Sequence, residues 1–285
     1  MSIDPQPRTS RTRLAIETVL VIALAVAAAI AARWLVLDGV IGELNDDAVY
    51  AMYARALLDG LGYVDTAMPE PLPATRYPIG FPALLALIMA GAGSIEVMIE
   101  RLQWVGPLTM ALTIAAVAVY FRREARLPLF FALAGASLLA LHPLTFALGT
   151  LVISDWVFTL ASLPVIVFLD RKLRGDRPAL GAFALGGALI AALCMLRYIG
   201  ATLLVALVLV LLWQRRFKQA AAAAAGFVAA MAPWWIFRAM SGGEEYHSTL
   251  GFLLGKDGGF LLQNLGASAS FLLTTVPGVL APYMI

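Results

Sequence analysis

The sequence predicts an all-α, polytopic membrane protein with about seven or eight transmembrane helices. Of its 285 residues, 61% are hydrophobic and only 13% are charged, and the mean hydropathy is +0.87. These values lie outside the range of soluble globular chains. Several apolar runs also approach the roughly 20 residues that cross a bilayer as a helix. Because lipid offers the backbone no hydrogen-bond partner, such segments are expected to be helices.

Seven apolar runs are expected to span the membrane, in order along the chain. They are 14–37, 102–121, 128–148, 153–170, 179–196, 199–213 and 219–237. The first run is longer than the apolar core of a signal peptide, so we expect an uncleaved helix. A further apolar stretch begins near Ala267 and is cut off at Ile285, which indicates a truncated C-terminus. The whole chain, 1–285, is expected to form one transmembrane domain.

The run 81–93, "FPALLALIMAGAG", decides the topology because it is too short to cross a bilayer. Basic clusters should lie on the cytoplasmic side of the membrane. If 81–93 does not cross, every cluster falls on that side, with the N-terminus. The clusters are Arg8/Arg11/Arg13, Arg122/Arg123/Arg126, Arg171/Lys172/Arg174/Arg177 and Arg215/Arg216/Lys218. Residues 38–101 then form one external loop with short interfacial helices, and 238–266 form a second.

The external loop opens with two adjacent acids, Asp46 and Asp47. Apolar residues recur after them with helical spacing as far as Leu58, which predicts a short amphipathic helix on the membrane surface. Asn45 or Asp46 could cap this helix, which would contribute about 1 kcal/mol. A cap needs only one carboxylate, however, so the second acid favours a functional role for the pair.

Arg76 and Tyr77 follow a proline-rich stretch and precede a Pro78-Ile79-Gly80 turn. The prolines predict a stiff, extended backbone. An arginine held at a helix start suits a phosphate group. The alternative is an Arg–Tyr pair at the lipid headgroups.

Asp155 and Arg197 are further charged residues on the expected external face. Asp155 could cap its helix, but an ionisable group at a membrane-helix end favours function. Arg197 is either a loop residue or a second phosphate ligand. His142 and His247 are too few for a zinc site, and the single cysteine, Cys194, excludes an intrachain disulfide. No metal site is therefore predicted.

The stretch "DDAVYAMYARALLDGLGY", followed by "RYPIGFPALLALIMAGAG" and "ERL", resembles the first external loop of the GT-C superfamily of integral-membrane glycosyltransferases. The closest similarity is to the aminoarabinose transferases and protein O-mannosyltransferases. "ISDWVFTLAS" resembles the second acidic site of that family. The resemblance covers about residues 14–200.

This resemblance implies an enzyme that moves a sugar from a polyprenyl-phosphate donor to a lipid, glycan or protein acceptor outside the membrane, with inversion expected. It implies a bacterial inner or plasma membrane. Asp46, Asp47 and Asp155 would be catalytic, and Arg76 and Arg197 would bind the donor phosphate, because Val49 stands where some relatives carry an arginine. Substrate-binding side chains would be Tyr50, Tyr77 and Tyr198.

The implied chemistry suits these residue types. A carboxylate can accept the acceptor's proton, and fixed cations stabilise a phosphate leaving group. A neighbouring carboxylate would raise one pKa of the pair and make a better base. No cofactor and no obligatory divalent metal is implied, and no basic segment with interleaved aromatics suggests nucleic acid. The alternatives are a non-catalytic or truncated relative, and a transporter or flippase subunit whose acids bind a coupling ion.

Overall fold

The computed structural model describes residues 11–35, 41–42, 46–67, 69–175 and 179–241. The chain divides into two units, Met1–Phe237 and Arg238–Ile285. Of the second unit, only residues 238–241 are described, so the predicted loop 238–266 lies mostly outside the described residues, as does the apolar stretch after Ala267. The sections below concern the first unit.

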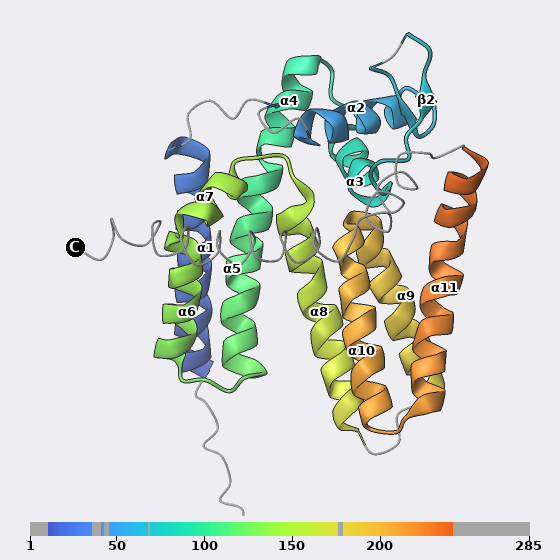
Figure 1. Ribbon diagram of the computed structural model, residues 1–285. Helices are drawn as coiled ribbons and strands as arrows, with labels where there is room; N and C mark the ends of the chain where they lie inside the picture. Colours follow the sequence, from blue (N-terminus) through green and yellow to red (C-terminus); the bar gives the residue numbers. More distant parts are fainter. Residues whose placement is uncertain (1–10, 36–40, 43–45, 68, 176–178, 242–285) are drawn as a thin grey trace, which may run out of the picture. The chain divides into compact units, whose positions relative to one another are not determined.

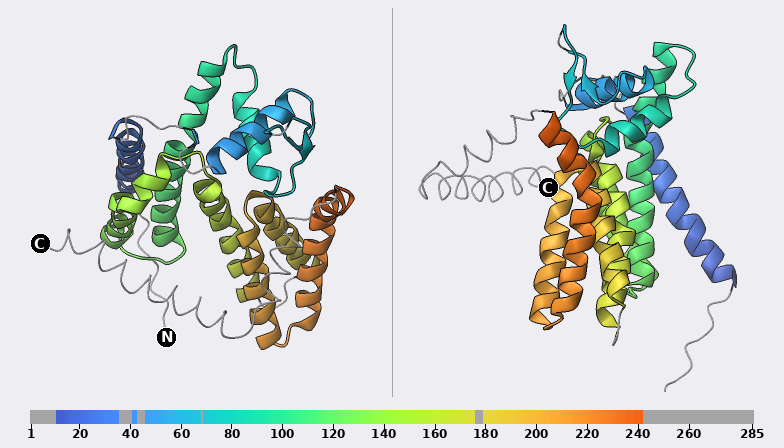
Figure 2. Two further views of the ribbon diagram at one scale, coloured as in Figure 1. Left: turned by 45° about the horizontal axis from the view of Figure 1, so that its top comes forward. Right: turned by 90° about the vertical axis from the view of Figure 1, so that its right-hand side faces the viewer.

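Long helices form the body of this unit (Figures 1 and 2). They are α1 (Arg11–Leu35), α5 (Val105–Arg123), α6 (Leu129–Leu141), α8 (Ser154–Arg174), α9 (Leu180–Leu196), α10 (Ala201–Trp213) and α11 (Phe217–Met240). The short helix α7 (Pro143–Gly149) follows α6, and the 3-10 turn η1 (Tyr198–Gly200) precedes α10. The described parts of the seven predicted apolar runs are thus mostly helical, with the run 128–148 divided between α6 and α7, and the expectation of an all-α chain is confirmed in its main outline.

Three of the described helices are long and apolar enough to cross a membrane: Ile16–Trp34, Ile95–Arg123 and Phe217–Met240. A fourth arises if α6 and α7, which meet at 63°, count as one broken span. The helix α9 has 17 residues and α10 has 13, fewer than the roughly 20 that a straight crossing needs. The helix α8 has 21 residues, but charged residues lie near both of its ends. The chain thus has membrane-type helices, whereas seven or eight spans stay a prediction.

Shorter elements gather at one end of the long helices (Figure 1). They are α2 (Asp46–Leu58), β1 (Val64–Asp65), β2 (Leu72–Pro73), α3 (Gly80–Met89) and α4 (Ile95–Gln103). The ten residues of α3 are too few to cross a bilayer, as expected for the run 81–93.

The strands β1 and β2 add a pairing to the extended, proline-rich segment. Its Leu72 and Pro73 pair antiparallel with Asp65 and Val64. Proline is tolerated in such an edge strand because it need not donate a ladder hydrogen bond there.

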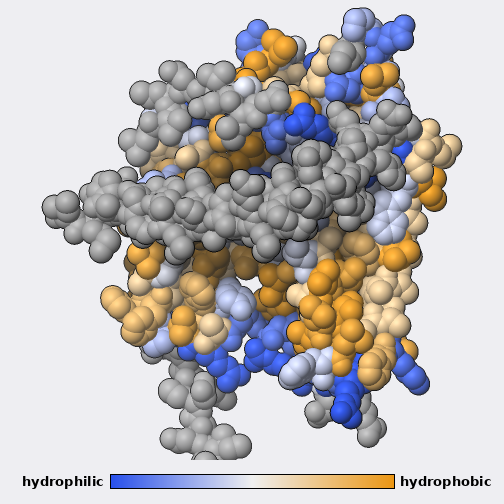
Figure 3. All heavy atoms as spheres, in the orientation of Figure 1, coloured by the Kyte–Doolittle hydropathy of each residue, from blue (hydrophilic) through white to orange (hydrophobic). Residues whose placement is uncertain are grey.

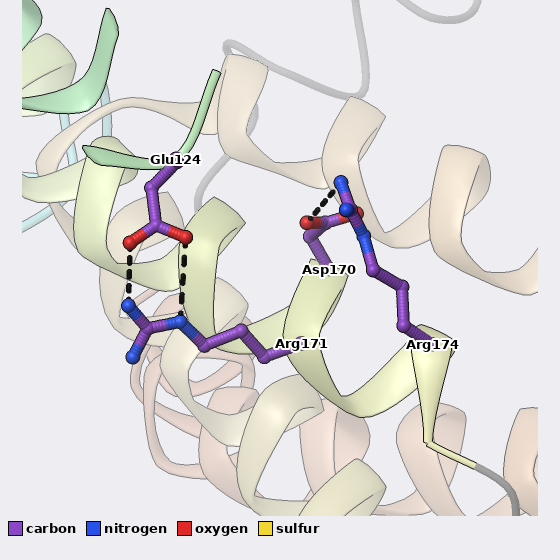
Figure 4. Close-up of polar contacts among 4 residues, drawn as sticks. All are labelled: Glu124, Asp170, Arg171 and Arg174. Atoms are coloured by element: carbon purple, nitrogen blue, oxygen red, sulfur yellow. Dashed lines mark hydrogen bonds and ion pairs between the residues drawn. The ribbon is translucent and has the colours of Figure 1, made fainter. Parts of the chain in front are cut away.

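The basic clusters lie together at the opposite end of the unit. Arg122 of α5 pairs with Glu17 of α1 at 3.1 Å, and Arg171 of α8 pairs with Glu124 after α5 (Figure 4). Arg174 pairs with Asp170 one turn earlier in α8, at 2.8 Å (Figure 4). Figure 3 shows hydrophilic side chains at this end, next to an apolar belt. Arg8 and Arg177, which belong to the predicted clusters, lie outside the described residues.

Two glycines let α9 and α11 approach each other closely. A Cβ atom on Gly187 would lie 1.9 Å from the carbonyl oxygen of Ala223, and one on Gly226 would lie 2.0 Å from that of Ala184. Small residues at such crossings are the usual means of close helix packing in membranes. Ala223, within the alanine tract 220–225, is one of the residues at this crossing.

Candidate functional site

The two adjacent acids occupy different environments. Asp47 is fully buried, and its carboxylate accepts hydrogen bonds from the amides of Gly42 at 2.8 Å and Ala48 at 2.9 Å. These bonds tie the chain before α2 to the first turn of that helix. Asp47 is thus engaged with the backbone near the start of α2, and Asn45, one of the two predicted caps, lies outside the described residues.

Asp46 faces the proline-rich segment instead. Its Oδ1 accepts a hydrogen bond from the phenol of Tyr77 and lies 3.8 Å from Nη2 of Arg76. The side chain is 45% exposed. No hydrogen bond to its second oxygen, Oδ2, occurs within the described part of the chain. One oxygen of Asp46 is therefore held in place and the other is accessible.

Arg76 lies over the ring of Tyr77, with Cζ 5.0 Å from the ring centroid. Burial raises the pKa of the Tyr77 phenol, and the hydrogen bond to the Asp46 carboxylate and the charge of that group raise it further. Tyr77 therefore remains a neutral hydrogen-bond donor at physiological pH. The predicted Arg–Tyr pair is present, and both residues contact Asp46.

Tyr50 connects this group to the second acidic site. Its ring lies 4.7 Å from that of Tyr77 and 4.9 Å from that of Phe81. Burial raises the pKa of Tyr50 most; the Ser154 hydroxyl lowers it, and the charges of Asp46 and Asp155 raise it. Arg197 also lowers this pKa. A single buried phenol is thus close enough to both acids to respond to each.

Asp155 and Arg197 form an ion pair between the start of α8 and the residue that follows α9. The Asp155 side chain is 38% exposed and that of Arg197 is 37% exposed. Ser154, next to Asp155, is fully buried, and its Oγ makes no hydrogen bond of ordinary geometry with the described residues. It nevertheless lies near enough to Tyr50 to influence the phenol's pKa.

Two close backbone contacts bring these segments together. A Cβ atom on Gly80, at the start of α3, would lie 2.5 Å from the carbonyl oxygen of Met195. A Cβ atom on Gly106, in the first turn of α5, would lie 2.4 Å from the carbonyl oxygen of Gly149. The first contact sets the segment of Tyr77 against the end of α9 that carries Arg197.

An apolar, aromatic cavity of about 310 Å³ adjoins these residues. The rings of Trp234 and Phe237 stack in it at 5.5 Å, and Tyr63 contacts Trp234 at 5.9 Å. Its lining consists of Tyr63, Ile79, Met195, Ala230, Pro233, Trp234 and Phe237. Ile79 and Met195 belong to the two segments that also carry Tyr77 and Arg197, so the cavity opens beside the charged site.

Tyr198 lies at this cavity and its hydroxyl accepts a hydrogen bond from Nε1 of Trp234 at 3.1 Å. Tyr198 was expected, from the resemblance, to bind substrate, and it directly follows Arg197 in the sequence. The structure associates Tyr198 with Trp234, and Arg197 with Asp155. Sequence reasoning missed Tyr63 and Trp234; the signal was a tryptophan pair, Trp234-Trp235, within an expected span.

The described residues contain no group of three or more His, Cys, Asp or Glu side chains that could hold a metal ion. His142 instead accepts a hydrogen bond from the amide of Leu144 at 3.2 Å and caps α7. His247 lies outside the described residues.

Comparisons of the chain with known protein families, with curated proteins and with solved structures find no match. Function must therefore be argued from the chemistry of the site itself.

Proposed function

We propose that the protein is a membrane glycosyltransferase of the GT-C type, which moves a sugar from a polyprenyl-phosphate donor to a lipid, glycan or protein acceptor. The observation that carries the proposal is that Asp46, Asp155 and Arg197, from distant parts of the chain, all act on the phenol of Tyr50, and that Arg76 lies beside Asp46. Asp46 and Arg76 come from the first expected loop, and Asp155 and Arg197 from the ends of α8 and α9.

Asp46 is the proposed general base. Its Oδ1 is engaged by Tyr77, which leaves Oδ2 to take the proton of an acceptor hydroxyl or amine. The acceptor atom forms a bond to the anomeric carbon while the bond from that carbon to the phosphate oxygen breaks. The electron pair leaves with the phosphate, and attack from the opposite face inverts the anomeric centre.

Arg197 and Arg76 are the proposed ligands of the departing phosphate. Negative charge develops on that group, and preformed cations stabilise it without reorganisation. Arg197 is held by Asp155, and Arg76 lies against Tyr77 and Asp46, so both cations are oriented before the donor binds. Asp155 is then a positioning residue for Arg197, and Asp47 is one for the start of α2.

The aromatic cavity supports a donor with a lipid tail. Its lining is almost wholly apolar, and it lies beside the segments that carry Tyr77 and Arg197. An amphiphilic donor can place its phosphate between the arginines and its first prenyl units in the cavity. A water-soluble nucleotide sugar would gain nothing from such a lining.

The proposal includes a membrane orientation. The acids lie at one end of the helices and the described basic clusters at the other, which suits an external active site and a cytoplasmic basic face. In this arrangement the N-terminus is cytoplasmic, α3 rests in the outer leaflet, and seven or eight helices cross a bacterial inner or plasma membrane. A transporter would instead keep its acids near the middle of the bilayer.

The test is transfer of labelled sugar by membranes that contain the full chain. The donors are a panel of polyprenyl-phosphate-linked hexoses and pentoses, and the total membrane lipid extract serves as acceptor. We expect wild type to transfer one of these sugars. The variant Asp46→Asn should transfer it at least about 100-fold more slowly, because general acid–base catalysis usually contributes a factor of this size.

The matched control is Asp59→Asn. Asp59 is an exposed aspartate just after α2 whose one ion pair among the described residues is with Arg55 at 2.8 Å, so its loss should leave the rate unchanged. Equal activity of Asp46→Asn and wild type would remove Asp46 from the mechanism. Absence of transfer by wild type with every donor would favour a non-catalytic relative.

A further inference from the structure

A second cavity, of about 230 Å³, lies at the basic end of the long helices, where its lining includes Arg122 and Arg123 at the end of α5. It lies among α1, α5 and α6, which contact one another. Apolar side chains form most of its wall, and the polar residues come from α1 and the end of α5. The polar residues are Glu17, Thr18, Arg122 and Arg123.

Arg122 is a poor ligand for an external anion, because each of its three nitrogens already donates a hydrogen bond within the protein. Its Nε and Nη2 donate to the two carboxylate oxygens of Glu17 at 3.1 and 3.2 Å, and Nη1 donates to the carbonyl of Leu127 at 3.4 Å. Glu17 itself is only 7% exposed. This bidentate pair ties α1 to α5 and neutralises the charge on that side of the cavity.

Arg123 differs from its neighbour. It lines the same cavity, its side chain is exposed, and it has no ion pair or hydrogen bond within the described part of the chain. The exposed Arg126 follows three residues later, with a left-handed backbone at φ 55°. The mouth of the cavity therefore carries uncompensated positive charge next to an apolar interior.

We propose that this cavity binds an anionic phospholipid of the surrounding leaflet, with its phosphate at Arg123 and one acyl chain between α1, α5 and α6. The charge complementarity selects the occupant: an apolar wall alone would accept any acyl chain, but the free guanidinium favours an anionic headgroup. Basic pockets between membrane helices are known to bind such headgroups. The bound lipid adds a contact between α1 and α6, both of which pack against α5.

This lipid site is independent of the proposed glycosyl transfer. It lies at the other end of the helices and uses none of the residues assigned to the donor. It is therefore a structural lipid site rather than a substrate site, and removing the lipid should affect thermal stability before it affects any reaction.

The test is native mass spectrometry of the purified full chain in detergent, titrated with dioleoylphosphatidylglycerol or with dioleoylphosphatidylcholine. We expect wild type to retain the anionic lipid more tightly. Reversal of one charge in Arg123→Glu should weaken that binding about tenfold, because each basic residue near an anionic lipid contributes of the order of 1 kcal/mol.

The matched control is Lys218→Glu. Lys218 is exposed at the same end of the unit but does not line the cavity, so its reversal should leave the affinity within about twofold, as expected for a distant surface charge. A second variant, Val119→Trp, places a larger side chain in the cavity lining and so reduces the cavity volume; Val119 is 42% exposed. Its control is Val205→Trp, which makes the same substitution on α10, outside the cavity lining.

The expected result is loss of the anionic lipid in Arg123→Glu and Val119→Trp, with binding retained in both controls. Equal binding of the two lipids by wild type would overturn the proposal. Equal weakening by Arg123→Glu and Lys218→Glu would also overturn it, because the lipid would then respond only to the net charge of that surface.

Discussion

Tyr77 donates a hydrogen bond to Oδ1 of Asp46 across 31 residues of sequence. The contact joins the proline-rich segment to the first residue of α2. It also distinguishes Asp46 from its neighbour Asp47, which makes its hydrogen bonds to backbone amides. Two identical side chains at consecutive positions thus have separate tasks, one at the site and one in holding the helix start.

The first prediction concerns the separate roles of Asp46 and Asp47. Asp47→Ala should lower the free energy of unfolding by about 1–3 kcal/mol, because two amides lose their acceptor in a buried place. Asp46→Asn should change stability far less, since its side chain is 45% exposed. Thermal unfolding of the purified variants in detergent measures both. Similar losses of stability in the two would refute the separation of roles.

The second prediction concerns the Asp155–Arg197 pair. Both side chains are more than a third exposed, so we expect a coupling free energy of only about 0.2–1 kcal/mol in stability. A double-mutant cycle with Asp155→Asn and Arg197→Gln measures this coupling.

The same cycle should show strong coupling in transfer rate, because either change alone disturbs the position of the guanidinium. In the single variant Asp155→Asn we expect a raised KM for the donor. Rates that fall additively, with KM unchanged, would show that Asp155 does not act through Arg197.

The third prediction uses the contact between α3 and α9. Gly80→Ala would place a Cβ atom 2.5 Å from the backbone oxygen of Met195. Backbone atoms cannot move aside as the end of a side chain can. We therefore expect the free energy of unfolding to fall by about 1–3 kcal/mol and the rate of sugar transfer to fall strongly. Gly93→Ala is the control because a Cβ atom there would meet nothing within 4 Å. Equal melting temperatures in the two variants would contradict the packing described.

The fourth prediction concerns pH. Burial raises the pKa of Tyr63 and Tyr77 in the folded chain, and the Tyr63 phenol also donates to the carbonyl of Tyr77 at 2.9 Å. The unfolded chain ionises its tyrosines near roughly pH 10. The stability contribution of these phenols is therefore complete below that pH and falls as the pH rises above it.

Absorbance titration of tyrosinate checks this prediction. We expect the folded protein to retain protonated tyrosines beyond roughly pH 10, the ordinary pKa of the phenol, and to ionise the rest only on unfolding. The variant Tyr63→Phe should remove one of these late-titrating groups. Complete ionisation of the folded chain in a single step near the ordinary pKa would contradict the burial of both phenols.

The fifth prediction tests the membrane orientation by labelling introduced cysteines with an impermeant maleimide. The native Cys194 is buried, so background labelling should be low. In intact cells we expect Gly93→Cys to react from outside and Gln214→Cys to react only after permeabilisation. Labelling of both positions from the same side would overturn the proposed arrangement of the interfacial helix α3.

The sequence by itself determined the helical class and the positions of the helices. Apolar runs in lipid leave the backbone no alternative to internal hydrogen bonding, so composition and run length suffice for α1, α5 and α11. The shortness of run 81–93 likewise predicted a helix, α3, that is too short to cross. Local spacing also predicted α2, which the structure places at Asp46–Leu58.

Only the tertiary structure decided how the charged residues pair. The sequence marked Asp46, Asp155 and Arg197 as unusual, but which acid meets which arginine depends on contacts between segments that are distant along the chain. The β1–β2 pair and the aromatic cavity of Trp234 depend on such contacts as well. Periodicity reports on neighbours within an element, whereas these features are set by close packing between elements, as at Gly80 against Met195.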